Sequence, residues 1–130
     1  MSDEFKVEIV NPDKSFYSND SVREVVVPAF EGEMGILKDH ISIISFLKPG
    51  IITIFNSTIE EKFYVEDGIL EFKDNVLSIL TSSIYNIKNI EKDKIAIDIT
   101  EAEKALKNPD LNDEGRYLIS QKIDVLKTIN

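Results

Sequence analysis

The side chains best suited to catalysis or binding lie in residues 31–40. This stretch holds the only histidine of the chain, His40, next to Asp39. A histidine beside a carboxylate suits general-base catalysis, but neighbours in sequence seldom face each other, and no serine lies in a nucleophile-elbow motif. One histidine cannot form a two-histidine metal site, and the absence of cysteine excludes thiolate ligands and a cysteine nucleophile. The pattern therefore predicts no catalytic residue and no metal site, and it gives His40 a structural, hydrogen-bonding role.

Two glycines shape the same stretch. Gly32 and Gly35 are three residues apart, and this placement indicates a backbone that adopts a positive φ or passes close to another segment. The spacing lacks the lysine and the following helix of a phosphate-binding loop, so a nucleotide site is not predicted. We expect a tight turn in a loop between two apolar runs, with a further turn at Pro49-Gly50.

Length and charge exclude several classes of function. The chain has 130 residues, 42% of them hydrophobic, and a formal net charge of −9. This length suits one globular domain, or a small domain with an appendage. Nucleic-acid binding needs a basic surface, so the negative charge argues against a nucleic-acid partner. No apolar run approaches the ~18 residues of a membrane-spanning helix, so no direct insertion into a membrane is expected.

The first two thirds of the chain have the pattern of β-structure. Phe5, Val7 and Ile9 alternate with other residues, which is typical of a strand with one buried face. We expect residues 18–21, Ser-Asn-Asp-Ser, to form a polar loop, and the β-branched residues 22–27 to form a second long strand. Turn residues then recur about every ten residues, and this spacing predicts an all-β sandwich or barrel.

Beyond residue 88 the apolar period changes to that of an α-helix. Spacings of four, three and four residues place one set of side chains on a single helical face: Ile95, Ile99, Ala102 and Leu106. Asn89 is the expected N-cap of this helix, and Asn112 or Asp113 that of a second one. The second helix has its own apolar stripe: Ile119, Ile123 and Leu126. The short connection predicts two antiparallel helices.

A hairpin of two short helices has little core of its own, since isolated helices of this length are marginally stable. The hairpin must therefore pack against the β part, against a partner, or against each of them at different times. In the last case it would be an element with two alternative positions. From Arg116 onward, the second helix carries Arg116, Lys122 and Lys127 against Asp124 alone. Such a basic helix can contact an acidic surface, and the plain alternative is an ordinary solvated face.

Several stretches, in this order and at this spacing, resemble one family. Residues 31–40 match a run E-G-x-x-G-[IVL]-x-x-x-H, and residues 47–50 match the L-x-P-G that follows it. Residues 64–72 and 76–80 are similar to later family stretches. Essentially the whole chain thus resembles the epsilon subunit of bacterial F-type ATP synthase, whose mitochondrial counterpart is called delta. Where the family usually has Pro-Gly before the histidine, this chain has Lys38-Asp39.

The resemblance implies a fold and a role. The expected fold is mainly β, with an N-terminal β-sandwich of about ten strands at residues 1–88 and a C-terminal α-helical hairpin at residues 89–130. The expected role is that of a non-catalytic rotor subunit of the central stalk, which couples c-ring rotation, through the gamma subunit, to ATP synthesis driven by protons. The implied location is peripheral, on the cytoplasmic face of the bacterial inner membrane. In many bacteria the hairpin can also extend along gamma and inhibit ATP hydrolysis.

The resemblance also implies contact residues. It places the loop of residues 31–40 at the c-ring and the gamma subunit, with these candidates: Glu31, Gly32, Glu33, Gly35 and His40. An extended hairpin would meet an acidic part of the beta subunits, with these candidates: Arg116, Lys122 and Lys127.

Some family members carry an ATP-binding motif, I-D-x-x-R-A, in the hairpin. The matching positions here include Ile90, Glu91 and Lys94. Lysine in place of arginine cannot make the bidentate fork that holds a phosphate, and neither the aspartate nor the alanine is kept. These changes argue against ATP binding by the hairpin, and no cofactor is expected.

A second interpretation is a free-standing ligand-binding β-sandwich with a regulatory helical tail. Such a protein would bind a small molecule saturably without other subunits. A rotor subunit would instead have no turnover of its own and would bind gamma. The nature of the binding partner therefore separates the two interpretations.

Overall fold

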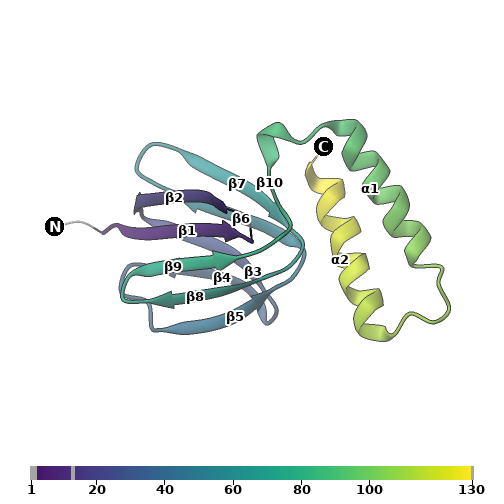
Figure 1. Ribbon diagram of the computed structural model, residues 1–130, viewed down its shortest axis with the longest axis horizontal. Helices are drawn as coiled ribbons and strands as arrows, with labels where there is room; N and C mark the ends of the chain where they lie inside the picture. The colour runs from purple at the N-terminus through teal and green to yellow at the C-terminus, as the bar shows by residue number, and fades with distance from the viewer. Residues whose placement is uncertain (1–2, 13, 130) are drawn as a thin grey trace.

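The computed structural model describes residues 3–12 and 14–129. In this part of the chain ten strands precede two α-helices. Figure 1 shows the strands on one side of the molecule and the helices on the other. The strands are β1 Phe5–Asn11, β2 Lys14–Val22, β3 Glu24–Ala29, β4 Gly32–Leu37, β5 Ile43–Leu47, β6 Gly50–Phe55, β7 Glu60–Val65, β8 Gly68–Lys73, β9 Val76–Leu80 and β10 Ile84–Asn86. A 3-10 turn, η1 at Ile87–Asn89, leads to α1 at Lys92–Ala105 and α2 at Asp113–Ile129. The predicted fold class is confirmed.

The strands form one continuous sheet that folds over into two layers. One layer contains β10, β7, β6, β3 and β4, and the other contains β5, β8, β9, β1 and β2. The layers join where Ala29 of β3 pairs with Leu47 of β5. Alternate side chains of both layers point inward and form the core, among them Val7, Val27, Ile52, Phe63 and Phe72. This alternation is the period-2 pattern that the sequence shows at β1.

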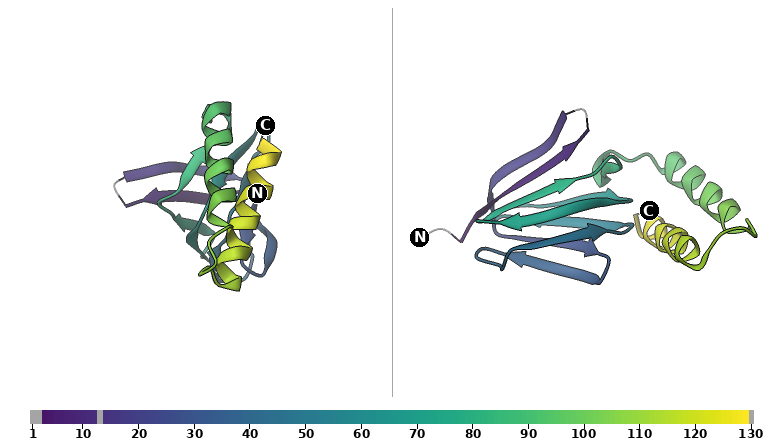
Figure 2. Two further views of the ribbon diagram at one scale, coloured as in Figure 1. Left: turned by 90° about the vertical axis from the view of Figure 1, so that its right-hand side faces the viewer. Right: turned by 60° about the horizontal axis from the view of Figure 1, so that its bottom comes forward.

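The helical hairpin lies beside one end of the strands and runs across their direction (Figures 1 and 2). We call this end of the sandwich the helix end and the opposite one, where β1 begins, the far end. Helix α2 contacts β6, and α1 packs on α2. The helices therefore cover the end of the sandwich more than either face.

The helix caps were predicted correctly for α2 and wrongly for α1. Asn112 Oδ1 accepts the N–H of Gly115 at 2.7 Å, as an N-cap does. Asn89 instead closes η1, and α1 begins at Lys92, with Glu91 at the cap position making no side-chain hydrogen bond. The reason is Ile90, whose extended backbone (φ −79°, ψ 126°) separates the 3-10 turn from the helix.

The polar loop expected at residues 18–21 is part of β2. Ser18 pairs with Glu8 and Asn19 pairs with Val7, so the strand continues to Val22. The long strand expected at residues 22–27 begins instead at Glu24. Strand β2 is the last in its layer, and polar side chains suit an edge strand because they discourage further strand pairing.

The Pro49-Gly50 turn brings β6 against β3. A Cβ on Gly50 would lie 2.8 Å from Cγ of Pro28 and closer still to its Cβ. A contact this short exists in no relaxed structure, so only glycine fits there without a shift of the backbone. This close approach accounts for the glycine of the L-x-P-G stretch.

Candidate functional site

Residues 31–40 do not form the predicted loop, because most of them belong to strand β4. The pairing with β3 runs from Gly32 opposite Ala29 to Leu37 opposite Glu24. At ~3.4 Å per residue, β4 covers roughly 17 Å. Glu31 therefore lies at the helix end of the sandwich and His40 lies towards the far end. The five predicted contact residues do not share one surface.

The turn between β3 and β4 presents the carboxylates of Glu31 and Glu33. Both residues are exposed, and the Glu31 carboxylate accepts a hydrogen bond from the hydroxyl of buried Ser45 at 3.0 Å. Gly32 has a φ of +137°, which only glycine adopts without strain, so its predicted positive φ is confirmed. Gly35 lies in regular strand, and a Cβ there would meet only the Glu24 carboxylate, at 3.4 Å.

His40 is held in place by its neighbours. Its Nδ1 lies 2.8 Å from the backbone oxygen of Ile41, and its ring meets Phe72 edge-on at 5.9 Å. Among the described residues no three histidine, aspartate or glutamate side chains are grouped to hold a metal ion. These contacts agree with the structural role expected for His40.

Asp39 stands where the family usually has glycine, and it has a φ of +66°. A left-handed backbone is unfavourable for most residues but is tolerated by aspartate, whose short side chain can hydrogen-bond locally. Asn75, in the turn between β8 and β9, supplies those bonds. Its Oδ1 accepts the Asp39 N–H at 2.7 Å, and its Nδ2 donates to Asp39 Oδ1 at 3.0 Å.

We expect Asp39→Ala to lower the free energy of unfolding by about 1–2 kcal/mol, because alanine keeps the strained φ and loses the side-chain bond. Asp39→Gly is the matched control and should stay within about 0.5 kcal/mol of the parent, because glycine relieves the strain. Urea unfolding of the three proteins measures the difference. An equal decrease in the free energy of unfolding in both variants would show that the hydrogen bonds with Asn75, rather than the backbone conformation, determine stability here.

An exposed apolar row crosses the outer face of the layer that contains β5, β8 and β9. Phe46 pairs with Ile69, and Ile69 pairs with Leu80, so the three side chains stand next to each other. Their exposed fractions are 59%, 42% and 53%. We call these three residues the apolar row. Val10 of β1 pairs with Leu80 and extends it at one side.

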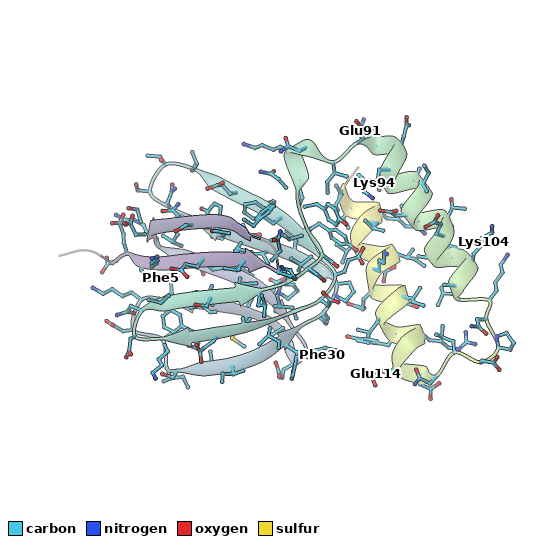
Figure 3. All side chains as sticks on the ribbon, in the orientation of Figure 1. Phe5, Phe30, Glu91, Lys94, Lys104 and Glu114 are labelled. Carbon is cyan, nitrogen blue, oxygen red and sulfur yellow. The ribbon has the colours of Figure 1, made fainter. Side chains whose placement is uncertain are left out.

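A hollow of about 550 Å³ lies beside the apolar row at the helix end. Its walls include Phe30, Pro12 and Thr81 in addition to the row itself. Phe30 is placed by its backbone N–H, which donates to the oxygen of Phe46 at 3.0 Å; Figure 3 shows it at the helix end. The surface thus combines large apolar side chains with a depression that fits a protruding side chain.

The apolar row was not predicted, although the sequence contains a signal for it. In a two-layer sandwich one of two consecutive strand residues must face outward. Consecutive apolar pairs occur at Phe46-Leu47, Ile69-Leu70 and Ile79-Leu80. In each pair one residue is buried and the other belongs to the row.

A second apolar cluster joins the helical hairpin to the sandwich. Tyr64 of β7, Ile95 of α1 and Leu126 of α2 are its buried members. Two polar contacts flank it: Lys122 Nζ lies 3.0 Å from a carboxylate oxygen of Glu66, and Lys48 Nζ donates to the Tyr117 hydroxyl at 3.1 Å. Six partly buried apolar side chains pack against these three: Ile51, Ile87, Ile90, Ile99, Val125 and Ile129. Among the described residues the cluster therefore has three buried members, against seventeen in the core of the sandwich.

The three basic residues predicted on α2 occupy different positions. Arg116 closes the helical hairpin internally, donating to the backbone oxygens of Leu106 at 3.0 Å and Asn108 at 3.2 Å. Lys122 forms the ion pair with Glu66, and Lys127 is exposed. In this structure the basic side chains are thus not gathered into one binding face.

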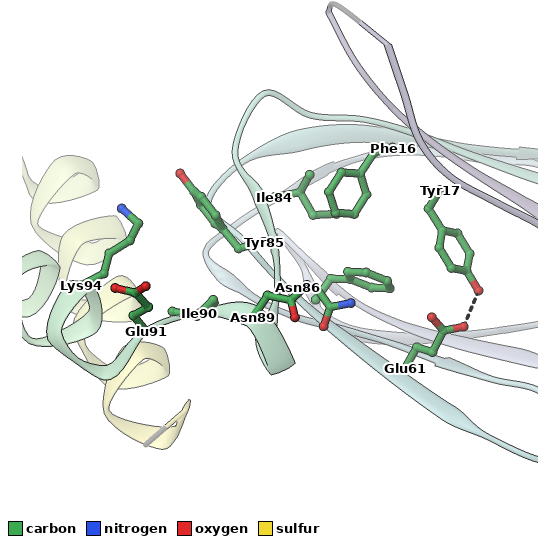
Figure 4. Close-up of a pocket in the computed structure, with 11 residues that line it drawn as sticks. Phe16, Tyr17, Glu61, Ile84, Tyr85, Asn86, Asn89, Ile90, Glu91 and Lys94 are labelled. Carbon is green, nitrogen blue, oxygen red and sulfur yellow. Dashed lines mark hydrogen bonds between the residues drawn. The ribbon is translucent and has the colours of Figure 1, made fainter.

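The residues that match the ATP-binding motif line a pocket between the sandwich and the start of α1, about 560 Å³ in volume (Figure 4). Among the described side chains that line it, Lys94 is the only cation, and it lies 3.6 Å from Asp98 and over the Tyr85 ring. Glu91 and Glu61 add two carboxylates. The Glu61 carboxylate accepts from the Tyr17 hydroxyl at 2.8 Å, and burial raises the pKa of Tyr17 to about 12. This pocket repels a polyphosphate more than it attracts one.

Calorimetric titration of the purified chain with ATP and Mg²⁺ should therefore give no saturable heat. The reason is electrostatic: one lysine already paired with a carboxylate cannot offset the charge of the triphosphate. Saturable binding that disappears in Lys94→Ala would contradict this expectation. Glu103→Ala, on the exposed side of α1, is the control for unspecific effects.

Comparison with known proteins agrees with this fold. Residues 4–87 match the family model described as ATP synthase, Delta/Epsilon chain, beta-sandwich domain. An ATP synthase epsilon chain of Pelagibacter ubique (strain HTCC1062) is 69% identical over 130 residues, which is the whole of both chains. The chain belongs to the ATP synthase epsilon-chain family. An epsilon chain of Dichelobacter nodosus (strain VCS1703A) is 38% identical over 111 residues, covering 85% of this chain and 77% of that one.

Solved structures show the same fold. A chain of the Euglena gracilis mitochondrial ATP synthase matches with a TM-score of 0.77 at 19% identity, covering 98% of this chain and 79% of that one. A chain of the Tetrahymena thermophila mitochondrial ATP synthase central stalk and c-ring matches with a TM-score of 0.66 at 14% identity, covering 98% of this chain and 96% of that one. Membership of the epsilon family, predicted from residues 31–40, 47–50, 64–72 and 76–80 together, is confirmed. It makes the chain an accessory subunit of ATP synthase and not the catalytic one.

Proposed function

We propose that this central-stalk subunit docks on the gamma subunit through the apolar row of Phe46, Ile69 and Leu80. The row is the single observation that carries this proposal, because monomeric proteins rarely leave such side chains exposed next to each other unless a partner covers them. The neighbouring hollow would take a protruding apolar side chain of gamma, as the centre of a binding surface does.

The surroundings of the apolar row have the character of an interface rim. In the next row towards the far end, Ile44 is 69% exposed and extends the apolar surface, and the residues paired beyond it are polar: Glu71, Ser78 and Glu8. A polar rim around an apolar centre is the usual anatomy of a protein interface. The purified chain should bind its cognate gamma subunit in a pull-down, and failure to bind would contradict the proposal.

We assign the contact with the c-ring to the turn between β3 and β4. Glu31 and Glu33 are its exposed carboxylates, and Gly32 gives the turn its shape. Gly35 lies further along the chain, within β4. Charges at the edge of an interface determine fit and orientation more than affinity. His40 lies towards the other end of β4, so it belongs to a different contact from Glu31 and Glu33.

The helical hairpin, residues 89–130, is proposed as a separate unit that can leave the sandwich, residues 1–88, and inhibit ATP hydrolysis. The docking cluster supports this, because among the described residues it has only three buried side chains, against seventeen in the core of the sandwich, so the hairpin can leave while that core stays intact. Extension would free Lys122 from Glu66 and leave it, together with Lys127, available to acidic beta subunits. Arg116 would stay within the hairpin, where it holds the turn between the helices.

Deletion of residues 89–130 should raise the rate of ATP hydrolysis by the assembled enzyme, because the inhibitory element is removed. The assembled complex with the full chain is the reference, and gamma binding by the truncated chain is the control, since the apolar row is untouched. Unchanged hydrolysis, with gamma binding intact, would reject the inhibitory role.

The chain would sit peripherally, on the cytoplasmic face of the bacterial inner membrane, and couple proton-driven rotation to ATP synthesis. Neither α1 nor α2, nor any other part of the described residues, forms a helix long and apolar enough to cross a membrane. The alternative of a free-standing ligand-binding sandwich is not favoured, since the relative that matches over its full length is an epsilon chain.

A further inference from the structure

Tyr64 is buried where the sandwich meets the helical hairpin. It lies on β7, only 2% exposed, and it packs against Ile95 of α1 and Leu126 of α2. Its ring also stacks on Tyr85 at 6.3 Å between centroids, with an interplanar angle of 21°. Tyr64 is thus the sandwich's main contribution to the docking cluster.

The hydroxyl of Tyr64 is buried and has no hydrogen-bond partner among the described residues. Two carboxylates stand near enough to influence it, but each already has a cation: Glu66 lies 3.0 Å from Lys122, and Asp98 lies 3.6 Å from Lys94. Burial, and then the charges of Glu66 and Asp98, raise the pKa of Tyr64. The group is therefore a neutral phenol that gives up its bonds to water when the hairpin docks.

An unpaired buried hydroxyl disfavours the state in which it is buried. When the hairpin leaves, the same hydroxyl is exposed to water and recovers its hydrogen bonds. The penalty therefore acts only on the docked state. The apolar ring of Tyr64 favours docking, while its hydroxyl opposes docking.

We propose that the Tyr64 hydroxyl is a built-in release element, which keeps the helical hairpin from docking too tightly on the sandwich. The inference rests on the proposed function of the hairpin as a unit that docks and leaves. The ion pair between Lys122 and Glu66 acts in the opposite direction and holds the docked state. The equilibrium is thus set by one unfavourable and one favourable polar group at the same contact.

The test uses the full chain with fluorophores at Ser57→Cys, in the exposed turn between β6 and β7, and Asp110→Cys, in the connection between the helices. The chain has no native cysteine, so the labels are specific. Energy transfer is followed as urea is raised, and the midpoint of separation is measured. Tyr64→Phe keeps the ring and removes the hydroxyl. Tyr85→Phe removes a hydroxyl from the stacked, 38% exposed ring and is the matched control.

At the urea concentration where the parent is half separated, Tyr64→Phe should raise the ratio of docked to separated chain at least about fivefold. Tyr85→Phe should change it less than twofold. A Tyr64→Phe ratio equal to or below that of the parent would overturn the proposal, as would an equal rise in Tyr85→Phe. Because no other subunit is present, failure of the inhibitory role in the assembled enzyme would leave this result unaffected.

Discussion

Replacing Ile69 by lysine should weaken binding of the gamma subunit by about 30-fold or more, since central apolar interface residues contribute about 2 kcal/mol or more each. Ile69 stands in the middle of the apolar row, between Phe46 and Leu80. A lysine there would bury an ammonium group against gamma with no carboxylate opposite it in the row. Isothermal titration of the full chain with purified gamma measures the loss.

Ile97→Lys is the matched control for Ile69→Lys. Ile97 is an isoleucine of similar exposure, 57% against 42%, but it lies on α1, away from the apolar row. The same charge change there should leave gamma affinity within about threefold of the parent. Equal affinity of the two variants would exclude the apolar row as the docking surface.

Replacing Leu126 by alanine should release the helical hairpin from the sandwich. Leu126 is 2% exposed and is one of the buried members of the docking cluster. Truncation of a buried leucine costs about 2–5 kcal/mol, and Leu126 is one of only three buried members of the cluster among the described residues. The labels at positions 57 and 110 should therefore separate at a markedly lower urea concentration.

Ile97→Ala serves as the control for Leu126→Ala, because it removes an exposed side chain of the same size from the helical hairpin. It should leave the midpoint of separation nearly unchanged. Leu126→Ala is thus expected to weaken the docking of the hairpin, and Tyr64→Phe is expected to strengthen it. An unchanged midpoint in Leu126→Ala would mean that the cluster does not hold the hairpin.

The sequence predicted the elements whose periodicity is strong. The stripe with Ile95 and Ala102 is the buried face of α1, and the stripe with Ile123 and Leu126 is that of α2. Such stripes persist because a helix buries one face whatever it packs against. The cap at Asn89 was wrong because an extended residue, Ile90, interrupts the helical run, and residue type alone does not reveal such a break.

The strands that were not predicted are those whose side chains are typical of loops although their backbone pairs in the sheet. Residues 18–21 are polar because β2 is an edge strand, and its backbone pairing with β1 holds it in the sheet. Residues 32–37 contain two glycines, yet they pair along the whole of β3. Local composition favours loops in both cases, and long-range pairing overrides it.

The candidate site was only partly accessible from the sequence. The family resemblance pointed to residues 31–40, but it did not show that β4 places Glu31 and His40 at different ends of the sandwich. The apolar row is formed by residues from three strands, and only their register brings Phe46, Ile69 and Leu80 together. Register is a property of the folded sheet, so no local pattern contains it.

Hydrogen–deuterium exchange of the chain, alone and bound to purified gamma, tests the central claim most directly. Gamma should protect the peptides that cover β5, β8 and β9, residues 43–47, 68–73 and 76–80. The exposed side of α1, around Ile97, should exchange at the same rate in both states. Protection confined to β3 and β6, on the opposite layer, or no protection in a saturated complex, would contradict docking through the apolar row.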